Sequence, residues 1–237
     1  MTHPPFTTKL CLTPRALREA FRLRHEAYSG KEYIHPHPNG LFFDELDAMP
    51  GTLNFAVYSG TEIAGAIRAC LYCPEIGWDD LPAAIKYPDE FGEWAASRAL
   101  VVEWCRLAVS PQFTEDALAV ELALLSSVPF LASRLPQVGF VCAVRTSHVR
   151  FYNRLGYERI SGFSKDPRLT FESTLMAMDW APHEERLRTH RLFSKCFEQQ
   201  PSLDALDPRS RAVFLNRFGS FAGPCLTTSS KTMVPQL

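Results

Sequence analysis

Apolar residues in the middle of the chain recur with the periods that predict strands and helices. Strand-length apolar or alternating runs occupy residues 53–58, 62–72, 101–111, 138–144, 157–160 and 170–180. Residues 117–135 carry apolar side chains at helical spacing, and Pro129 predicts a break in that helix. A shorter helix is predicted from Ser147 to Leu155, with Gly156 as its C-terminal cap.

From residue 53 the predicted order is therefore strand, strand, strand, helix, strand, helix, strand, strand. The turn Ser59-Gly60-Thr61 predicts that the first two strands form a hairpin. Residues 74–97 predict loops and short helices before the central strand. The two strand-helix-strand units predict right-handed crossovers. We expect an α/β (α+β) fold with a mixed, mostly antiparallel central sheet flanked by helices.

The N-terminal part of the chain predicts one long helix. After a short extended start, Thr13 and Pro14 form a helix-start signal, and the helical pattern runs to about Tyr28. One face of this helix is basic and carries Arg15, Arg18 and Arg22. Such a face is either solvated or a docking surface for an acidic partner.

The composition changes at Pro182. We therefore expect residues 1–182 to form the main domain and residues 183–237 to form a C-terminal helical extension. Within the extension, a second short helix is predicted at about residues 207–218, and a frayed tail at residues 223–237.

The composition supplies enough apolar material for a full-sized core. The 237 residues are 46% hydrophobic and 12% aromatic, and the net charge is -1. Without an excess or a run of Lys and Arg, the sequence predicts no nucleic-acid partner. The N-terminus lacks a signal-peptide pattern, and no apolar run reaches transmembrane length. We therefore expect a soluble, cytoplasmic protein.

The cysteines and histidines predict neither disulfides nor a metal site. The seven cysteines are an odd number without paired spacing, which fits a reducing compartment. We interpret them as small buried hydrophobic residues. Cys70 and Cys73 form a C-x-x-C pair that no second pair follows, and His35 and His37 lack a third ligand at metal-binding spacing.

Charged residues interrupt strands that otherwise read as buried. Glu103 and Arg106 lie in the run 101–111, and Arg68 lies in the run 62–72. An unpaired buried charge is costly, so these groups should pair with other charges or face a polar cleft. Residues three apart in a flat strand point to opposite faces, so Glu103 and Arg106 share a side only if a bulge lies between them. Such a bulge would free backbone N–H groups for a ligand, whereas an ordinary buried ion pair is the alternative.

A second group of charged and polar residues precedes these strands. Arg24 and Tyr28 are four residues apart and can share one face near the end of the first helix. Asp44 and Asp47 can lie on one side of a turn, within reach of a cation such as Arg24. The group predicts a charged wall, and a solvated acidic loop is the alternative.

The segment at residues 150–157, Arg-Phe-Tyr-Asn-Arg-Leu-Gly-Tyr, and the strand order together resemble the GNAT-type N-acyltransferases. In that superfamily a Phe-Tyr-x-x-x-Gly-Phe/Tyr segment closes the acyl-donor site. The glycine-rich pyrophosphate loop of the superfamily is absent, because residues 111–116 read Pro-Gln-Phe-Thr-Glu-Asp. Without glycine the backbone wraps a pyrophosphate less easily, which speaks against acetyl-CoA as the donor. The resemblance implies a GNAT-like fold.

Four short motifs in order resemble the charged signature of autoinducer (acyl-homoserine lactone) synthases and of the related N-acyl amino acid synthases. These motifs are Arg24 with Tyr28, Asp44-x-x-Asp47, Gly65-x-x-Arg68 and Glu103-x-x-Arg106. The resemblance covers about residues 15–180. The Phe-Tyr pair at residues 151–152 favours the N-acyl amino acid synthases, as does the lack of the tryptophan that autoinducer synthases usually carry after the first helix.

This resemblance implies transfer of a fatty acyl group, expected to be long, to the amine of an amino acid. The donor would be an acyl-phosphopantetheine thioester, on acyl carrier protein as a partner or on coenzyme A, and no cofactor would be bound permanently. The acyl chain would need an apolar tunnel, for which the sequence offers Trp104, Leu122, Leu125, Phe130 and Phe140. Two alternatives stay open: an autoinducer synthase that uses S-adenosylmethionine, and a non-catalytic acyl- or carrier-binding protein.

The resemblance also implies roles for individual residues. Glu103 is expected to take the proton of the amine, and Tyr152 to protonate the departing thiolate. The side chains expected to bind or enclose the substrates are Arg24, Arg68, Arg106, Asp44, Asp47 and Trp104. The backbone N–H groups expected at the acyl donor and its oxyanion are those of Leu107, Ala108 and Val109. An ordering role is preferred for the two aspartates, and a packing role is the alternative for Tyr152.

Overall fold

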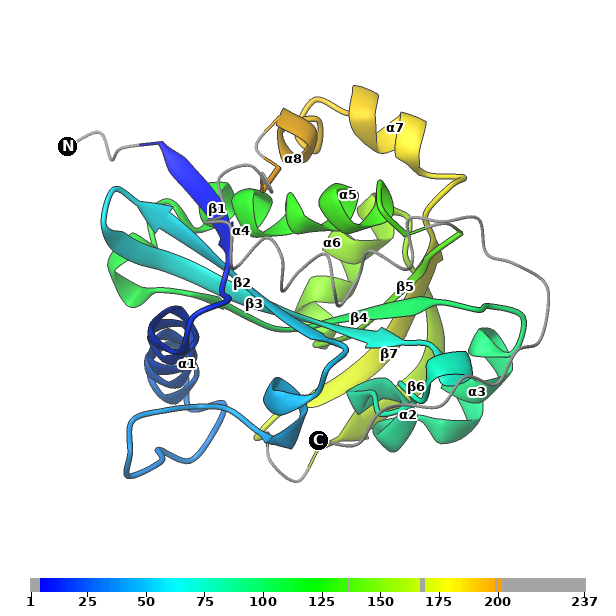
Figure 1. Cartoon of the computed structure of the whole chain (residues 1–237), viewed down its shortest axis with the longest axis horizontal. Coiled ribbons are helices and arrows are strands. Elements are labelled where there is room, and N and C mark those ends of the chain that lie inside the picture. The colour runs from blue at the N-terminus through cyan, green and yellow to red at the C-terminus, as the bar shows by residue number, and fades with distance from the viewer. Residues whose placement is uncertain (1–4, 136, 167–168, 199, 202–237) are drawn as a thin grey trace.

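The computed structural model describes residues 5–135, 137–166, 169–198 and 200–201. Its seven described strands form one sheet in the order β1-β2-β3-β4-β5-β7-β6 (Figure 1). The strands are β1 (Phe6–Leu10), β2 (Thr52–Ser59), β3 (Glu62–Tyr72), β4 (Val101–Val109), β5 (Gly139–Val144), β6 (Glu158–Lys165) and β7 (Glu172–Asp179). Neighbouring strands are antiparallel except β4 and β5, which are parallel. The predicted mixed, mostly antiparallel sheet is confirmed.

Helices cover both faces of the sheet (Figure 1). One face carries α4 (Ala117–Leu125), α5 (Ser127–Ala132), α6 (Thr146–Leu155), α7 (Glu184–Thr189) and α8 (Lys195–Glu198). The other face carries α1 (Pro14–Ser29), α2 (Pro82–Lys86) and α3 (Pro88–Ala95). Three 3-10 turns complete the described elements: η1 (Glu45–Ala48), η2 (Pro74–Ile76) and η3 (Pro111–Phe113).

Alternating side chains of the strands divide the core between the two faces. Phe55 of β2 and Trp104 of β4 belong to the larger cluster under α4 and α5. On the opposite face, Ala56 of β2 and Ala108 of β4 pack against α1. Because alanine is small, α1 can lie close to the strands that build the site.

The helix boundaries follow the local sequence. The side chain of Thr13 accepts the N–H of Ala16 and so caps the start of α1. The predicted long helix breaks at Ser126, and Pro129 lies in the first turn of α5, where an N–H has no helical acceptor. Gly156 caps α6 with a φ of 102°, which glycine adopts without strain. The predicted helix start, break and cap are therefore confirmed.

The described part of the C-terminal extension packs on the main core. Leu187 of α7 and Cys196 of α8 are buried, and so is Phe193 between them. The helix predicted at residues 207–218 and the tail predicted at residues 223–237 lie outside the described residues, so the two-part division of the chain stays a prediction. Within the described ranges, no helix combines the length and the apolar character that crossing a membrane requires.

Candidate active site

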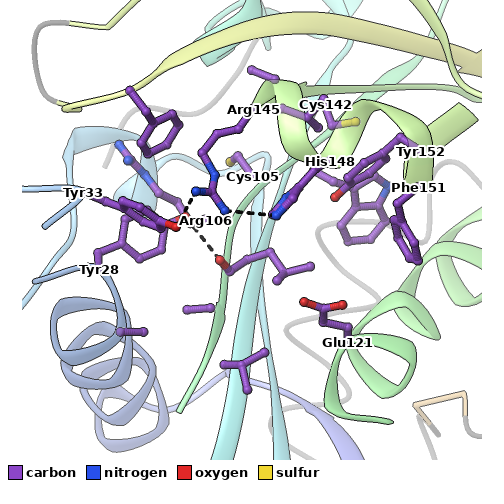
Figure 2. A pocket seen from close by; sticks show the side chains of 18 of the residues that line it. Tyr28, Tyr33, Cys105, Arg106, Glu121, Cys142, Arg145, His148, Phe151 and Tyr152 are labelled. Carbon is purple, nitrogen blue, oxygen red and sulfur yellow. Dashed lines mark hydrogen bonds between the residues drawn. The ribbon is translucent and has the colours of Figure 1, made fainter. Parts of the chain in front are cut away.

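The two parallel strands at the centre of the sheet separate and leave a cavity. β4 and β5 share three residue pairs, the last of which joins Glu103 and Val141. Beyond them, residues 104–109 of β4 and residues 142–145 at the end of β5 line a cavity of about 320 Å³ (Figure 2). Helices close it with the side chains of Tyr28, Glu121 and Tyr152. Groups from α1, α4, α6, β4 and β5 can therefore meet at one ligand.

A bulge in β4 shapes the wall of this cavity. Cys105 lies opposite Arg68 and Ala108 lies opposite Ala66, so two residues of β4 face one residue of β3. Arg106, the first residue of the bulge, has a φ of 57°. This left-handed conformation costs a residue with a side chain about 1–2 kcal/mol. The bulge that the charge pattern left open is therefore present in β4.

The strand separation leaves one edge of β4 facing the cavity. Leu107, Ala108 and Val109, the residues expected at the acyl donor, all line it, and so does Trp104. The carbonyl of Leu107 accepts a hydrogen bond from the hydroxyl of Tyr28 at 3.2 Å, which holds the end of α1 against the strand. This placement suits a donor site, and the roles of the four residues stay predictions.

Three arginines and two aspartates form a network beside the cavity. Asp47 accepts hydrogen bonds from Arg24 and Arg68, each at 2.9 Å. Asp44 accepts one from Arg68 at 2.5 Å and one from Arg106 at 2.8 Å. Because these residues come from α1, β3, β4 and the start of η1, the network ties four segments together.

Only one of the three arginines reaches the cavity. The side chains of Arg24 and Arg68 are 0% exposed and do not line it, whereas Arg106 does. Burial alone would raise the pKa of Asp44, but the hydrogen bond and charge of Arg68, joined by those of Arg106, lower it well below its ordinary value. The part predicted for Arg24, Arg68, Asp44 and Asp47 in substrate binding stays a prediction.

Glu103 is completely buried and does not line the cavity. Its Oε2 accepts the N–H of Ala83 in α2 at 2.7 Å, and its Oε1 has no hydrogen-bond partner among the described residues. Burial raises the pKa of Glu103 well above its ordinary value, the charge of Cys105 adds to this, and the N–H of Ala83 opposes it. Glu103 and Arg106 do not form the ion pair that was considered from the sequence, because Asp44 binds Arg106 instead. The role of Glu103 as a base stays a prediction.

Cys105 is a polar member of the site that its apolar surroundings in the sequence concealed. Its Sγ accepts a hydrogen bond from Nε of Arg68 at 3.2 Å, across the β3–β4 ladder. A hydrogen bond from Cys70 lowers the pKa of the Cys105 thiol, burial opposes this, and the charge of Arg68 lowers it further. A single strand pattern does not reveal such a cross-strand partner.

Arg145 supplies positive charge that the sequence analysis did not assign to the site. It follows β5 directly, donates a hydrogen bond to the hydroxyl of Tyr33 and lies 3.0 Å from Nε2 of His148 (Figure 2). No acidic side chain binds Arg145 in the described part of the chain. Burial lowers the pKa of His148, and the charge of Arg145 lowers it further, so the imidazole is neutral at neutral pH. Arg145 is therefore free to bind an anion.

Glu121 was also missed, although it is an acid within the apolar helix α4. Its carboxylate points into the cavity (Figure 2). Burial raises the pKa of Glu121, and the charge of Lys31 opposes the shift. The cavity thus holds a carboxylate as well as cations. Among the described residues, no group of three or more His, Cys, Asp and Glu side chains is placed to hold a metal ion.

Tyr152 lies in the cavity wall on α6. Its ring packs edge-on against Phe151 and Tyr157, with centroids 5.6 and 5.4 Å away. Burial raises the pKa of Tyr152 well above its ordinary value, so the phenol keeps its proton at neutral pH. A protonated phenol can serve as a proton donor, and that role of Tyr152 stays a prediction.

Comparison with known proteins identifies the family. The sequence model of the N-acyl amino acid synthase FeeM matches residues 19–179, well over half of the chain. The chain belongs to the FeeM family of N-acyl amino acid synthases. As a FeeM-family protein it is an acyltransferase, and the resemblance seen in its four charged motifs is confirmed. A comparison with curated proteins found no match.

Solved structures share the fold of this FeeM-family chain. FeeM, an N-acyl amino acid synthase from uncultured soil microbes, has a TM-score of 0.61 at 16% identity, over 81% of this chain and 98% of that chain. The CoA-dependent acyl-homoserine lactone synthase MesI has a TM-score of 0.54 at 17% identity, over 81% and 93%. An acyl-CoA N-acyltransferase from Pseudomonas aeruginosa has a TM-score of 0.51 at 15% identity, over 73% and 97%. At these identities the likenesses establish the GNAT-like fold alone.

Proposed function

We propose that this FeeM-family protein transfers a fatty acyl group from a phosphopantetheine thioester to the amine of an amino acid. The observation that carries the proposal is the cavity between β4 and β5, which joins an apolar part to a cationic part. Leu125 and Phe151 line the apolar part. Arg106 and Arg145 line the cationic part, across the cavity from Phe151 (Figure 2). An acyl chain suits the first part, and the carboxylate of an amino acid suits the second.

Arg145 is the side chain that would hold the carboxylate of the acceptor. A guanidinium binds a carboxylate through two parallel hydrogen bonds. Arg106 already shares Asp44 with Arg68, whereas no acid binds Arg145 in the described residues. An incoming carboxylate would therefore neutralise Arg145 and place the amine of the acceptor in the cavity.

The reaction forms one C–N bond and breaks one C–S bond. The lone pair of the amine attacks the thioester carbonyl carbon, and negative charge develops on the carbonyl oxygen beside the N–H groups of residues 107–109. The C–S bond then breaks as the nitrogen loses its second proton, the sulfur leaves as a thiolate that Tyr152 would protonate, and the proton lost by the nitrogen would restore the phenol of Tyr152. The amine is mostly protonated at neutral pH, so a base must first remove a proton from it.

Two carboxylates are candidates for that base. Glu103 does not line the cavity, so it would act only through an intervening water molecule. Glu121 lines the cavity and could reach the amine directly, and its raised pKa suits a proton acceptor that works near neutral pH. Glu103 is the base that the family resemblance implies, and Glu121 is the alternative that the cavity lining suggests.

We further propose acyl carrier protein as the carrier of the donor. Arg15, Arg18 and Arg22 of α1 are exposed and form a basic surface that an acidic carrier could contact. Coenzyme A would present the same phosphopantetheine arm to the cavity. None of the six described cysteines forms a disulfide, which fits a reducing compartment such as the cytoplasm.

The test is to incubate the purified protein with acyl-phosphopantetheine thioesters and single amino acids, and to identify the products by mass spectrometry. We expect an N-acyl amino acid. Arg145→Gln should raise the KM of the acceptor about tenfold or more, because a hydrogen bond to a charged group contributes about 1.5–3 kcal/mol. Arg154→Gln, an exposed change on α6, should leave it unchanged.

Other outcomes of this experiment would distinguish the two alternative functions. An acyl lactone made from S-adenosylmethionine would identify an autoinducer synthase. Donor binding without any product would support a non-catalytic acyl-binding protein. If an N-acyl amino acid forms, comparing Glu103→Gln with Glu121→Gln at saturating acceptor identifies the base, since loss of its carboxylate lowers kcat rather than raising KM.

A further inference from the structure

A second, smaller cavity lies beneath the C-terminal helices. Its volume is about 30 Å³. No charged side chain of the described residues lines it, and its walls include Val128, Tyr157, Trp180, Leu187, Phe193 and Phe197. A cavity needs about 10–15 Å³ to admit one water-sized group. This cavity therefore admits about two such groups, which is the size of the last carbons of an acyl chain.

Only a thin partition separates this cavity from the active site. Leu125, the last residue of α4, lines both cavities. Tyr152 on the active-site side packs against Tyr157 on the other side, with ring centroids 5.4 Å apart. Phe151 packs against Phe193 across the same boundary at 5.8 Å. The partition is one side chain thick at Leu125 and two rings thick at the aromatic pairs, and opening it at these points displaces no charged group.

We propose that the acyl chain passes Leu125 and ends in this second cavity, so that α7 and α8 set the chain length that the enzyme accepts. This inference rests on the proposed function. The family match ends at residue 179, whereas α7 begins at Glu184, so the wall formed by Leu187, Phe193 and Phe197 lies beyond the matched residues. The closed end of the acyl site would thus lie outside the part of the chain that the family model matches.

The physical basis of the selection is the burial of methylene groups. Each methylene that leaves water for an apolar site tightens binding about fourfold. A chain too short to pass Leu125 gains nothing from the second cavity. A chain too long for it must displace packed side chains, so affinity should rise with length and then fall.

The test measures the Kd of phosphopantetheine thioesters, from butanoyl to hexadecanoyl, by calorimetry on the full-length protein. Phe197→Ala enlarges the second cavity and should move the tightest-binding length upward. Val128→Phe fills the cavity and should raise the Kd of the longer thioesters about tenfold or more. Leu192→Ala is the matched control, because Leu192 lies in the same segment but lines a separate groove. Butanoyl binding should not change in any of the three variants.

An unchanged length profile in the variants, with butanoyl binding retained, would overturn this inference and leave the proposed function standing. If no thioester of any length binds the native protein, the proposed function falls, and this inference falls with it. Phe197 is only half-buried, so Phe197→Ala decides the question alone if Val128→Phe does not fold.

Discussion

A buried carboxyl group needs a proton or a cation, and no cation among the described residues forms a hydrogen bond with Glu103. It is 0% exposed, and the N–H of Ala83 occupies one of its oxygens. The pKa of Glu103 is raised by burial, so the folded protein holds a proton that the unfolded chain releases above about pH 4. Glu103 therefore stabilises the fold fully at low pH and progressively less as the pH rises.

Replacement of Glu103 by a neutral side chain of the same shape should remove this pH dependence. We expect Glu103→Gln to have the native free energy of unfolding near pH 4 and to exceed it near pH 8 by about 1–3 kcal/mol. Urea unfolding across this range measures the difference. A variant that loses more stability near pH 8 than near pH 4 would show that Glu103 is charged and bound to a cation.

Among the elements, α4 matters most for the cavity because it carries Glu121 and Leu125. Its distance from the sheet depends on Gly65 of β3. A Cβ at Gly65 would lie 2.6 Å from Cγ1 of Val120 and 3.1 Å from the carbonyl oxygen of Ala108. Neither neighbour can move without shifting α4 or β4, so the glycine is required for close packing.

Gly65→Ala should therefore push α4 away from β3. We expect a loss of about 1–3 kcal/mol in stability, which lowers Tm by about 2–4 °C for each kcal/mol, and a lower acyl-transfer rate. Gly92→Ala is the control, because nothing lies within 4 Å of a Cβ there and alanine favours helix α3 by about 0.5–1 kcal/mol. Thermal unfolding of both variants provides the measurement, and equal Tm values would contradict the packing argument.

Most elements could be predicted because each depends on nearby residues. β3 and β4 are strand-length apolar runs, and α1 begins at a recognisable cap. β1 was expected only as an extended start, since its strand character depends on pairing with β2 more than forty residues later. The position of β7 between β5 and β6 likewise depends on pairing between strands that are distant in the sequence, which no local pattern predicts.

The site could be predicted only in part, for a related reason. A charge within an apolar strand is costly, so Arg68, Glu103 and Arg106 stood out in the sequence. Arg145 and Glu121 did not, because the end of a strand and a helix surface are places where charges are usually solvated. The partner of Glu103 was unpredictable, because Ala83 contributes its backbone N–H from a five-residue helix.

For the whole molecule, the arginine–aspartate network joins the N-terminal third of the chain to the sheet. Asp44 binds Arg68 of β3 and Arg106 of β4, and Asp47 binds Arg24 of α1. Because the pKa of Asp44 is lowered in the folded state, its stabilisation is complete above the pKa of unfolded Asp, about 3.9, and is lost as the pH falls towards the folded pKa.

Asp44→Asn should thus cost much stability at neutral pH and little in acid. We expect a loss of about 3 kcal/mol near pH 7, since the buried Arg68 and the partly buried Arg106 each lose a partner. The difference in unfolding free energy from the native protein should narrow as the pH falls below about 4. Asp79→Asn, an exposed change, should show neither effect. Urea unfolding at each pH supplies the values. If the difference in unfolding free energy between Asp44→Asn and the native protein stays constant with pH, the charge of Asp44 is not the stabilising feature.

The short β4–β5 ladder has a mechanical consequence. With three shared residue pairs, it joins β1–β4 to β5–β7 as a hinge joins two plates. A small rotation about this hinge widens the far end of the gap and breaks few hydrogen bonds. Helix α5 opposes that rotation, because Phe130 packs against Phe55 of β2 while Val128 lines the second cavity together with Met178 of β7. We therefore expect the stiffness of this packing, rather than any single residue in the cavity, to limit how far the gap between β4 and β5 can widen around a substrate.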